Sequence, residues 1–351
     1  MNLQIFSLLT IAAALAAAPN ETPKKALLVL AKSDNTLGIV DPVSLKVLAR
    51  VPSGQDPHEV IASADGRYAF ISNYGGGSYN TITVVDLLEQ KNLPAIDLGP
   101  LKGPHGLVFV GGKLWFTAEG AKVIGSYDPA SKKIDWVLGT GQNRTHMLWV
   151  SPDMKHMITS NVSSATMTLI DQVAGGRGPG GPRGPGGPRP EGQRPPPPPR
   201  GPDWEETVIA VGRGAEGFDV SPDGREVWAA NAQDGTLSIL DLAAKKNVQT
   251  LEADVRSANR LKFTPDGKHV LVSSLGNSDL VVLDVATRKT IKRIKIGKGA
   301  AGIQMHPGGA IAYIACTPDD YVAIIDLKTL EVTGHLDAGR QPDGMAWVER
   351  P

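Results

Sequence analysis

Short runs of apolar residues, several of them alternating with polar ones, fill almost the whole chain, and most runs stop at a turn-forming sequence. The segment 212–246, GRGAEGFDVSPDGREVWAANAQDGTLSILDLAAKK, is the clearest example. Its apolar run at 217–220 ends at Ser-Pro-Asp-Gly, where proline sets φ and glycine tolerates a positive φ. Further runs at 226–230, 236–240 and 248–251 follow, separated by Gln-Asp-Gly and by a polar turn. This pattern predicts four short antiparallel strands joined by tight turns.

Degraded copies of this unit fill the chain between residues 26 and 351. An aspartate that ends the third strand marks each copy: Asp41, Asp86, Asp128, Asp171, Asp241, Asp284 and Asp326. Four strands in about forty residues is the periodicity of a β-propeller blade, which needs neighbours because it cannot bury both faces alone. The seven aspartates therefore predict an all-β fold, a seven-bladed β-propeller of four-stranded antiparallel blades.

The first copy lacks one strand. Only the runs 26–31, 36–40 and 47–51 precede the turn that opens the second copy, whereas the C-terminal run 345–348 has nothing after it to pair with. Pairing this run with the N-terminal strands would remove the open edges of an incomplete blade. We therefore expect the C-terminal strand to join blade 1 and close the ring.

The N-terminus has the pattern of a secretory signal. Residues 1–16 contain an apolar run of the length of a signal-peptide core, with small residues at Ala14 and Ala16 where a signal peptidase reads the chain. We expect a signal peptide at 1–16, a short mature segment at 17–25 and one propeller domain at 26–351. The mature chain should then be periplasmic or secreted and have no transmembrane segment. Because no Lys or Arg precedes the run, an uncleaved anchor is the alternative.

Composition narrows the classes of partner and cofactor. Lys and Arg together number 36 and Asp and Glu number 36, so the balanced charge gives no argument for nucleic-acid binding. Cys316 is the only cysteine, which excludes an internal disulfide framework, a CxxCH haem attachment and a cysteine-rich metal site. No activating motif surrounds Cys316, so a small buried residue is a better interpretation than a nucleophile. We expect a monomer.

One long interval, between Asp171 and Asp241, contains an insertion at 173–202 that is rich in Pro, Gly and Arg. Proline removes strand donors and glycine adds no apolar surface, so the insertion is predicted to be disordered, in part as polyproline II. Its five arginines against one glutamate would suit an acidic or anionic partner, or a proline-binding domain. The alternative is a loop expansion without function. Its place between strands three and four puts it on the face opposite the channel mouth.

Aligning the seven copies places one residue of each at the entry of the innermost strand. These residues are His58, His105, His146, Glu216, Asn259, Ala301 and Asp343. Three of the seven histidines of the chain share this position, on consecutive blades. Residues beside it or in the next loop complete the set: Glu59, Asn73, Tyr74, Glu119, Arg144 and Arg260. Because inner strands converge on the axis, these side chains should surround one funnel.

Three interpretations of this funnel stay open. His58, His105 and His146 with a carboxylate are the ligand types of a divalent transition metal. A mixed lining of His, Arg and acidic residues could instead hold an anionic or sugar-like ligand, with His58 or His146 moving a proton. The third interpretation is that histidine belongs to the repeat and was copied with the blade.

The repeats carry resemblances to known families. The segments 212–246 and 297–331, GKGAAGIQMHPGGAIAYIACTPDDYVAIIDLKTLE, resemble the YVTN-repeat β-propellers, which are secreted or periplasmic and related in repeat pattern to surface-layer propellers. This likeness covers residues 26–351 except the Pro/Gly insertion. DPHEVIASADGRYAFISNYGGGS also resembles the phosphogluconolactonase-like lactonases, which hydrolyse sugar lactones in a mouth lined by His, Arg and Glu. That resemblance implies catalytic roles for His58, His105, Arg144 and Glu216. The repeat is also similar to propellers that hold haem d1 or pair with quinoprotein cofactors.

These observations favour an exported propeller that binds a small ligand or a protein partner over its channel mouth. The alternatives are a lactonase-like hydrolase, with Arg144 or Arg260 holding an anionic group, and a metal-binding propeller.

Overall fold

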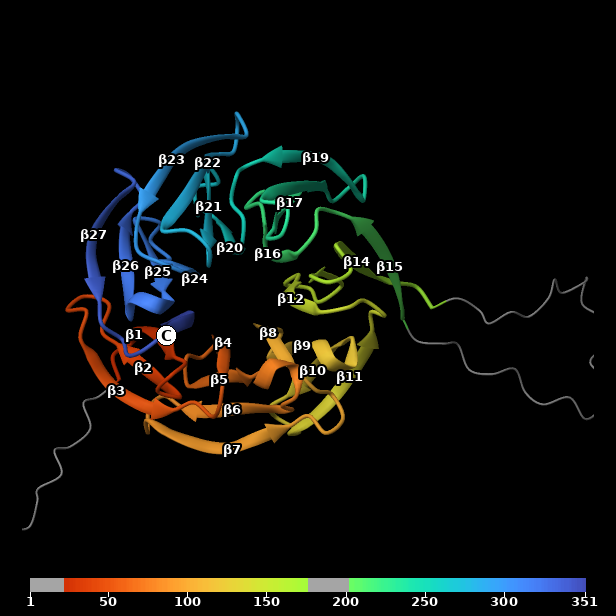
Figure 1. Cartoon of the computed structure of the whole chain (residues 1–351). Coiled ribbons are helices and arrows are strands. Elements are labelled where there is room, and N and C mark those ends of the chain that lie inside the picture. Colours follow the sequence, from red (N-terminus) through yellow and green to blue (C-terminus); the bar gives the residue numbers. More distant parts are fainter. Residues whose placement is uncertain (1–21, 176–201) are drawn as a thin grey trace, which may run out of the picture.

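Seven four-stranded antiparallel sheets surround a central opening in the computed structural model, which describes residues 22–175 and 202–351 (Figure 1). The predicted seven-bladed propeller is confirmed. Every inner strand lies at the opening and every fourth strand at the rim of the disc, because each blade runs outward in chain order.

The strands of each blade follow from the opening outward. Blade 1 contains β28 (Pro342–Glu349), β1 (Lys25–Ala31), β2 (Thr36–Val40) and β3 (Val47–Pro52). Blade 2 contains β4 (Pro57–Ala62), β5 (Tyr68–Asn73), β6 (Thr81–Asp86) and β7 (Lys91–Asp97). Blade 3 contains β8 (Pro104–Val110), β9 (Lys113–Ala118), β10 (Val123–Asp128) and β11 (Lys133–Gly139). Blade 4 contains β12 (Thr145–Val150), β13 (His156–Asn161), β14 (Thr166–Val173) and β15 (Asp203–Ala210).

The remaining blades continue the same order. Blade 5 contains β16 (Ala215–Val220), β17 (Glu226–Asn231), β18 (Thr236–Asp241) and β19 (Lys246–Glu252). Blade 6 contains β20 (Ala258–Phe263), β21 (His269–Ser274), β22 (Asp279–Asp284) and β23 (Lys289–Lys295). Blade 7 contains β24 (Ala300–Met305), β25 (Ile311–Cys316), β26 (Tyr321–Asp326) and β27 (Glu331–Leu336). Three single 3₁₀ turns, η1 (Gly75–Gly77), η2 (Glu119–Ala121) and η3 (Thr317–Asp319), join second to third strands.

The ring closes in blade 1 as expected. β28 pairs antiparallel with β1, with Met345 opposite Val29 and Val348 opposite Ala26. The two ends of the chain therefore share one sheet, and the innermost strand of that sheet is the last strand of the sequence (Figure 1).

The turns are held by their own polar side chains. In blade 5 the hydroxyl of Ser221 donates to Asp223 and accepts the backbone N–H of Glu226 at 2.9 Å. In all blades but blade 4, the repeated aspartate at the end of the third strand accepts backbone N–H groups of the following turn, as Asp284 accepts that of Thr287 at 2.7 Å. Six of the seven aspartates do this: Asp41, Asp86, Asp128, Asp241, Asp284 and Asp326. These short-range bonds explain why the repeat is visible in the sequence.

Apolar side chains fill the space between neighbouring blades. One cluster joins Phe70 and Ile82 of blade 2 to Leu107 and Phe116 of blade 3, and similar clusters join the other blades. Cys316 is fully buried in one of them, and burial raises the pKa of its thiol to about 12. This agrees with the expected structural role of that cysteine.

The inner strands of adjacent blades approach so closely that a methyl group would not fit. A Cβ on Gly344 of β28 would lie 2.3 Å from the carbonyl oxygen of His58 in blade 2. The same approach occurs at Gly106, Gly217 and Gly302. Glycine is required at these positions for contact with the neighbouring backbone.

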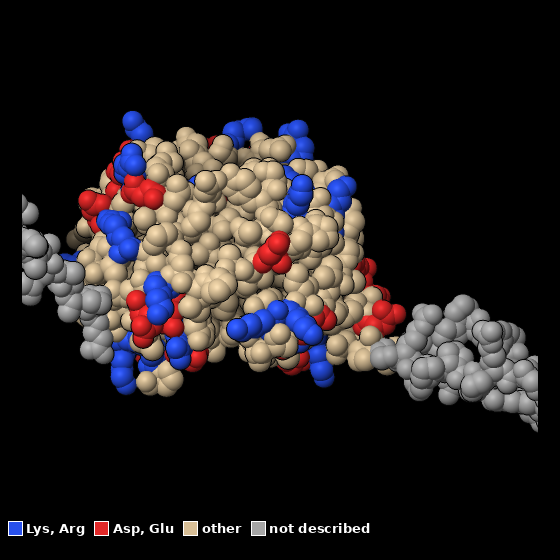
Figure 2. Space-filling view, turned by 90° about the horizontal axis from the view of Figure 1, so that it is seen from below, with Lys and Arg blue, Asp and Glu red and all other residues tan. Residues whose placement is uncertain are grey.

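Some predictions fall outside the described residues. They are the signal peptide at 1–16 and most of the insertion at 173–202. β14 and β15 pair out to Val173 opposite Asp203, so the described strands reach the predicted boundaries of the insertion. Within residues 22–175 and 202–351, no helix has the length and apolar character needed to cross a membrane. Figure 2 shows one side of the disc, where basic and acidic residues lie next to one another.

We predict that Gly344→Ala destabilises the fold, because the added methyl group forces β28 away from β4. Overpacking of this kind costs about 1–3 kcal/mol, so the melting temperature should fall by several degrees in differential scanning calorimetry. Gly139→Ala is the control, because nothing lies within 4 Å of a Cβ at that position. Equal melting temperatures for the two variants would contradict a close contact between the inner strands.

Candidate functional site

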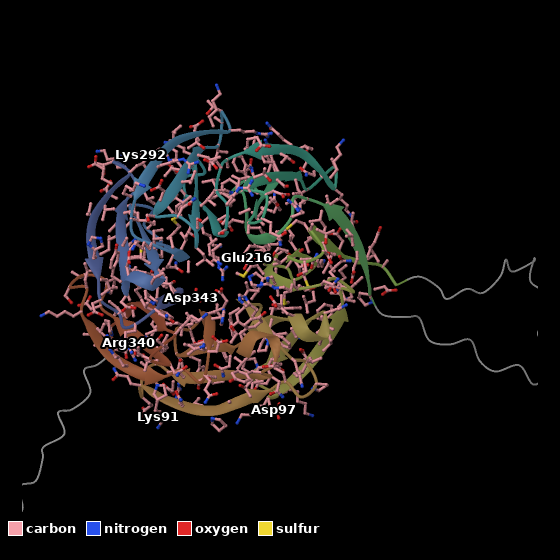
Figure 3. All side chains as sticks on the ribbon, viewed as in Figure 1. Lys91, Asp97, Glu216, Lys292, Arg340 and Asp343 are labelled. Atoms are coloured by element: carbon pink, nitrogen blue, oxygen red, sulfur yellow. The ribbon has the colours of Figure 1, made fainter. Side chains whose placement is uncertain are left out.

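A β-bulge interrupts every inner strand at the channel mouth. The pairing of each inner strand with its neighbour shifts register across two residues, which in blade 2 are His58 and Glu59. The corresponding first residues are His105, His146, Glu216, Asn259, Ala301 and Asp343. Bulges often occur beside functional sites because they re-aim side chains. The structure thus brings the residues aligned from the sequence to one ring, and Figure 3 shows Glu216 and Asp343 at the central opening.

The residue two positions before each of these has a left-handed backbone. Glycine fills this position in blades 3, 5 and 7, where it has no steric cost. Asp56 and Arg144 fill it in blades 2 and 4, with φ of 48° and 53°. Non-glycine residues in this conformation are strained and cluster at functional sites. The two charged side chains therefore occupy positions where the fold itself favours glycine.

His146 is held between two glutamates. Its Nδ1 hydrogen-bonds Glu119 Oε1, and its Nε2 lies 3.0 Å from Glu216 Oε1, an ion-pair contact without good hydrogen-bond geometry. The side chain is only 2% exposed. Burial alone would lower the pKa of His146, but Glu216 and Glu119 outweigh it and raise the pKa to about 9. His146 is therefore a buried imidazolium at neutral pH.

The two glutamates are ionised for the same reason. Burial opposes their charge, yet His146 and Arg144 lower the pKa of Glu216 to about 2 and also lower that of Glu119. Glu119 accepts a 2.5 Å hydrogen bond from the hydroxyl of Tyr74 and a 3.5 Å bond from Arg144 Nε. Burial and this neighbour raise the pKa of Tyr74, so its phenol stays protonated. Four blades thus contribute to one network of hydrogen bonds and ion pairs.

His105 stacks on this network without joining it. Its ring centre lies 3.8 Å from that of His146 and 5.1 Å from those of His58 and Tyr74. Burial, and then the charge on His146, hold the pKa of His105 well below its ordinary value. Its Nδ1 is buried without a hydrogen-bond partner. His105 is therefore a neutral ring between two other imidazoles.

His58 marks the more open side of the mouth. Lys32 Nζ lies 2.8 Å from its Nε2, Asp56 Oδ1 lies 3.1 Å from the same nitrogen, and Asp343 Oδ2 lies 4.0 Å from Nδ1. Lys32 also lies 3.3 Å from Asp343. Burial lowers the pKa of His58 in spite of the two aspartates. A neutral imidazole next to an ammonium group and carboxylates can accept a proton.

Arg260 and Glu59 form an ion pair across the opening, between blades 6 and 2. Arg260 is almost fully buried and also donates to the backbone oxygen of Asn259 at 3.1 Å. Its guanidinium is therefore held by the protein, whereas the side chain of Arg144 is 42% exposed. Arg144 and Arg260 were both considered for holding an anionic group, and the side chain of Arg144 is the more exposed of the two.

Two predicted residues contribute less than expected. Asn73 donates from Nδ2 to Thr81 at 3.1 Å and to Thr83 at 2.9 Å, so its amide nitrogen supports blade 2. Asn259 stays on the ring, with its Oδ1 buried and without a partner.

The metal interpretation of His58, His105 and His146 depends on how their rings are placed. Within the described part of the chain, no group of three or more His, Cys, Asp or Glu side chains is placed to hold a metal ion. The imidazole rings of His105 and His146 lie 3.8 Å apart with their planes tilted by 35°, and the nitrogens of His146 face carboxylates. The sequence correctly indicated that the three histidines are close, but it could not indicate how their rings are oriented.

Lys32 and Asp56 were missed in the sequence. Lys32 directly follows the second strand of blade 1, the position that Tyr74 and Glu119 hold in blades 2 and 3. Since the C-terminal run was already assigned to complete blade 1, an alignment of the residue that follows the second strand in every blade would have included Lys32. An alignment of the position two residues before the bulge would have shown Asp56 where blades 3, 5 and 7 have glycine.

The charge on His146 predicts how stability depends on pH. Because folding raises the pKa of His146 from 6.5 to about 9, its stabilisation is complete below pH 6.5 and is lost as the pH rises to 9. The free energy of unfolding should fall over this range by up to about 3 kcal/mol. The pKa values of His58 and His105 are lowered, so these two residues affect the free energy of unfolding only below this pH range.

Urea unfolding at several pH values between 6.5 and 9 measures this slope. His146→Gln should abolish most of it, whereas His335→Gln, at the exposed rim, should keep it. An unchanged slope in His146→Gln would show that another group carries the effect.

Comparisons with known proteins agree with the fold. The family model of YNCE-like β-propellers matches residues 200–307. No curated protein matches the chain. Similar solved structures include a functionally unknown protein from Desulfotomaculum acetoxidans, with 11% identity and a TM-score of 0.70 over 93% of this chain and 99% of that one. A putative 6-phosphogluconolactonase from Bacteroides fragilis has 15% identity and a TM-score of 0.67 over 94% of this chain and 100% of that one.

Dihydro-heme d1 dehydrogenase NirN in complex with DHE has 16% identity and a TM-score of 0.62, over 92% of this chain and 66% of that one. Identities this low establish a common fold and no common activity. Both families that the repeats resemble are represented among these matches at the level of fold. The chain is thus a seven-bladed β-propeller whose residues 200–307 match the YNCE-like β-propeller family.

Proposed function

We propose that the channel mouth binds a small hydroxylated acid, such as a sugar acid. The carrying observation is the network around His146, which assembles side chains from blades 2 to 5 in one buried cluster. Perturbed pKa values within a concave site are typical of functional sites. Building an ionised Glu-His-Glu group into a fold is costly, since each charge must leave water.

The side chains at the channel mouth suit an acid that carries hydroxyl groups. The side chain of Arg144 is partly exposed and could give a carboxylate the planar pair of donors that guanidinium provides, and the Lys32 ammonium group lies beside His58 at the same mouth. Asp56 and Asp343 lie beside Lys32 and His58 and supply acceptors, which suit hydroxyl donors of the ligand. The rings of Tyr74 and His58 meet edge to face at 4.8 Å and border the same space.

Gluconate is the test ligand, and glucose is its uncharged comparator. Isothermal titration calorimetry should give a single gluconate site, with weaker binding of glucose. Arg144→Asn should weaken gluconate binding by about tenfold or more, because a hydrogen bond to a charged group contributes about 1.5–3 kcal/mol. Asn is chosen because it tolerates the left-handed backbone at this position.

Arg213→Asn is the matched control, since Arg213 lies in the same type of loop in blade 5 and pairs with Asp234. Gluconate binding that is insensitive to Arg144→Asn, or absent, would overturn the proposal. Binding of glucose as tight as that of gluconate would show that no acidic group is recognised.

A second candidate function is lactone hydrolysis. It is favoured by the neutral imidazole of His58, which could take a proton from a water molecule that attacks a lactone carbonyl and return it to the leaving ring oxygen, while Arg144 binds the carboxylate formed as the ring opens. The fold likeness to a putative 6-phosphogluconolactonase supports it only at the level of architecture.

His58→Asn should then lower kcat/KM for δ-gluconolactone by about a hundredfold or more, measured by proton release after subtraction of spontaneous hydrolysis. His335→Gln should leave the rate unchanged. Wild-type protein that does not exceed the spontaneous rate would dismiss catalysis and leave the binding proposal intact.

A further inference from the structure

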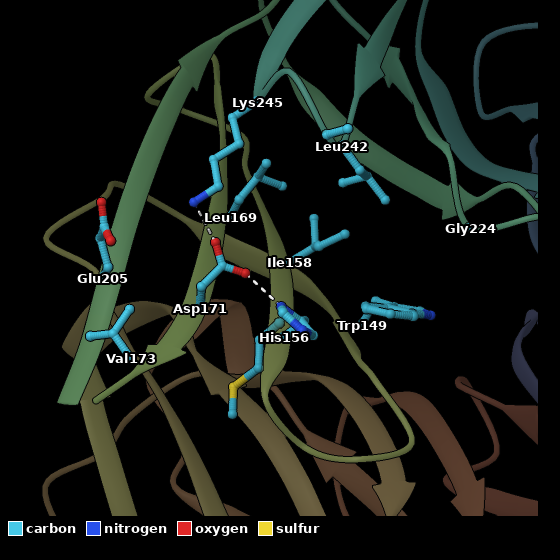
Figure 4. A pocket seen from close by; sticks show the side chains of 12 residues that line it. Trp149, His156, Ile158, Leu169, Asp171, Val173, Glu205, Gly224, Leu242 and Lys245 are labelled. Atoms are coloured by element: carbon cyan, nitrogen blue, oxygen red, sulfur yellow. Dashed lines mark hydrogen bonds and ion pairs between the residues drawn. The ribbon is translucent and has the colours of Figure 1, made fainter. Parts of the chain in front are cut away.

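A second cavity of about 580 Å³ opens between blades 4 and 5, away from the mouth (Figure 4). Its lining includes Val173 at the end of β14, Gly224 in the turn between β16 and β17, and Lys245 in the turn between β18 and β19. Turns between first and second and between third and fourth strands lie at the end of the blades opposite the mouth. The cavity is therefore separate from the site around His146.

The cavity occurs where the repeat departs from its pattern. Asp171 is the repeated aspartate of blade 4, but its chain continues into a strand that pairs out to Val173. Its carboxylate has no following tight turn to hold and instead contacts the imidazole of His156 and the ammonium group of Lys245. His156 Nδ1 lies 2.6 Å from its Oδ1, and Lys245 Nζ of blade 5 lies 2.6 Å from its Oδ2 (Figure 4).

This polar group lies at one end of an apolar surface. Trp149, Ile158, Leu169 and Leu242 line the other side of the cavity, as Figure 4 shows. A mostly apolar cavity of this size with a few convergent polar groups is typical of small-molecule sites. The apolar residues come from both blades, so the cavity depends on their packing.

The polar end still has donors to offer. Asp171 uses both carboxylate oxygens, whereas the ammonium group of Lys245 has three N–H donors, of which Asp171 engages one. The side chains of Lys245 and His156 are 38% and 58% exposed, so both reach solvent. Glu205, also on the lining, is exposed on the outer strand. The Asp171 carboxylate is already paired with His156 and Lys245, and the Lys245 ammonium group would repel a positively charged ligand amine.

We propose that this cavity binds an amphiphilic carboxylate, with its apolar body against Trp149 and Leu242 and its carboxylate at Lys245. The proposal is independent of the function proposed for the mouth. Lys245 stays charged in this setting, since the hydrogen bond and charge of Asp171 raise its pKa. The apolar lining selects against small hydrophilic acids, and the single accessible ammonium group selects for one negative charge.

Decanoate is the probe, in isothermal titration calorimetry with the full chain at pH 7. Decylamine and decan-1-ol, which have the same alkyl chain with a positive charge and with none, are the comparators. We expect one decanoate site, and binding at least about tenfold weaker for both comparators, because a charge-assisted hydrogen bond is lost.

Lys245→Met should weaken decanoate binding by about tenfold and bring it close to that of decan-1-ol. Lys246→Met is the matched control, because Lys246 is the next residue, is exposed and does not line the cavity. Leu242→Trp, which fills the cavity, should abolish binding. Melting temperatures show whether each variant folds. If Leu242→Trp does not fold, Lys245→Met still tests the proposal.

Absence of decanoate binding at millimolar concentration would overturn the proposal, as would equal binding of decylamine. An equal loss in Lys245→Met and Lys246→Met would do so as well. Arg144→Asn in the mouth should leave decanoate binding unchanged, so failure here and failure of the mouth proposal give different results.

Discussion

Direct backbone contact between neighbouring inner strands is the constraint on which the mouth depends. In blade 3 the hydroxyl of Thr117 accepts the N–H of Gly106 at 2.8 Å and donates to the carbonyl oxygen of His146 in blade 4 at 2.7 Å. Ser160 and Ser273 make the same bridge from blades 4 and 6. These hydroxyls fix the backbone of mouth residues without using mouth side chains. The ring can therefore keep its shape while the chemistry of the mouth differs from blade to blade.

The chemistry is distributed unevenly around this regular ring. Blades 1 to 6 carry the charged and aromatic groups, whereas blade 7 places Ala301 on its bulge and Thr317 after its second strand. The Arg260–Glu59 pair spans the opening from blade 6 to blade 2. A ligand that uses Lys32 and Arg144 would therefore lie to one side of the axis, toward blades 1 to 4.

The sequence predicted the elements that local interactions determine. The side chains of Asp284 and Ser221 form hydrogen bonds with residues only two or three positions away. The turns that they stabilise therefore recur as similar short motifs in the sequence. Side-chain orientation could not be predicted this way, because Asn73 and Tyr74 are adjacent yet one supports its blade and the other faces the mouth. Asp171 shows the same limit. It looks like the other repeated aspartates, and only its contact with the next blade gives it a different role.

The position of β28 has a consequence for the order in which the protein is made. Asp343, which contacts Lys32 and faces His58, belongs to the last strand of the sequence, and that strand also lines the central opening. During synthesis from the N-terminus, six blades can form before the strand that completes blade 1 has left the ribosome. The mouth therefore becomes complete only after β28 has been synthesised, so a chain that stops short of β28 lacks one wall of the site.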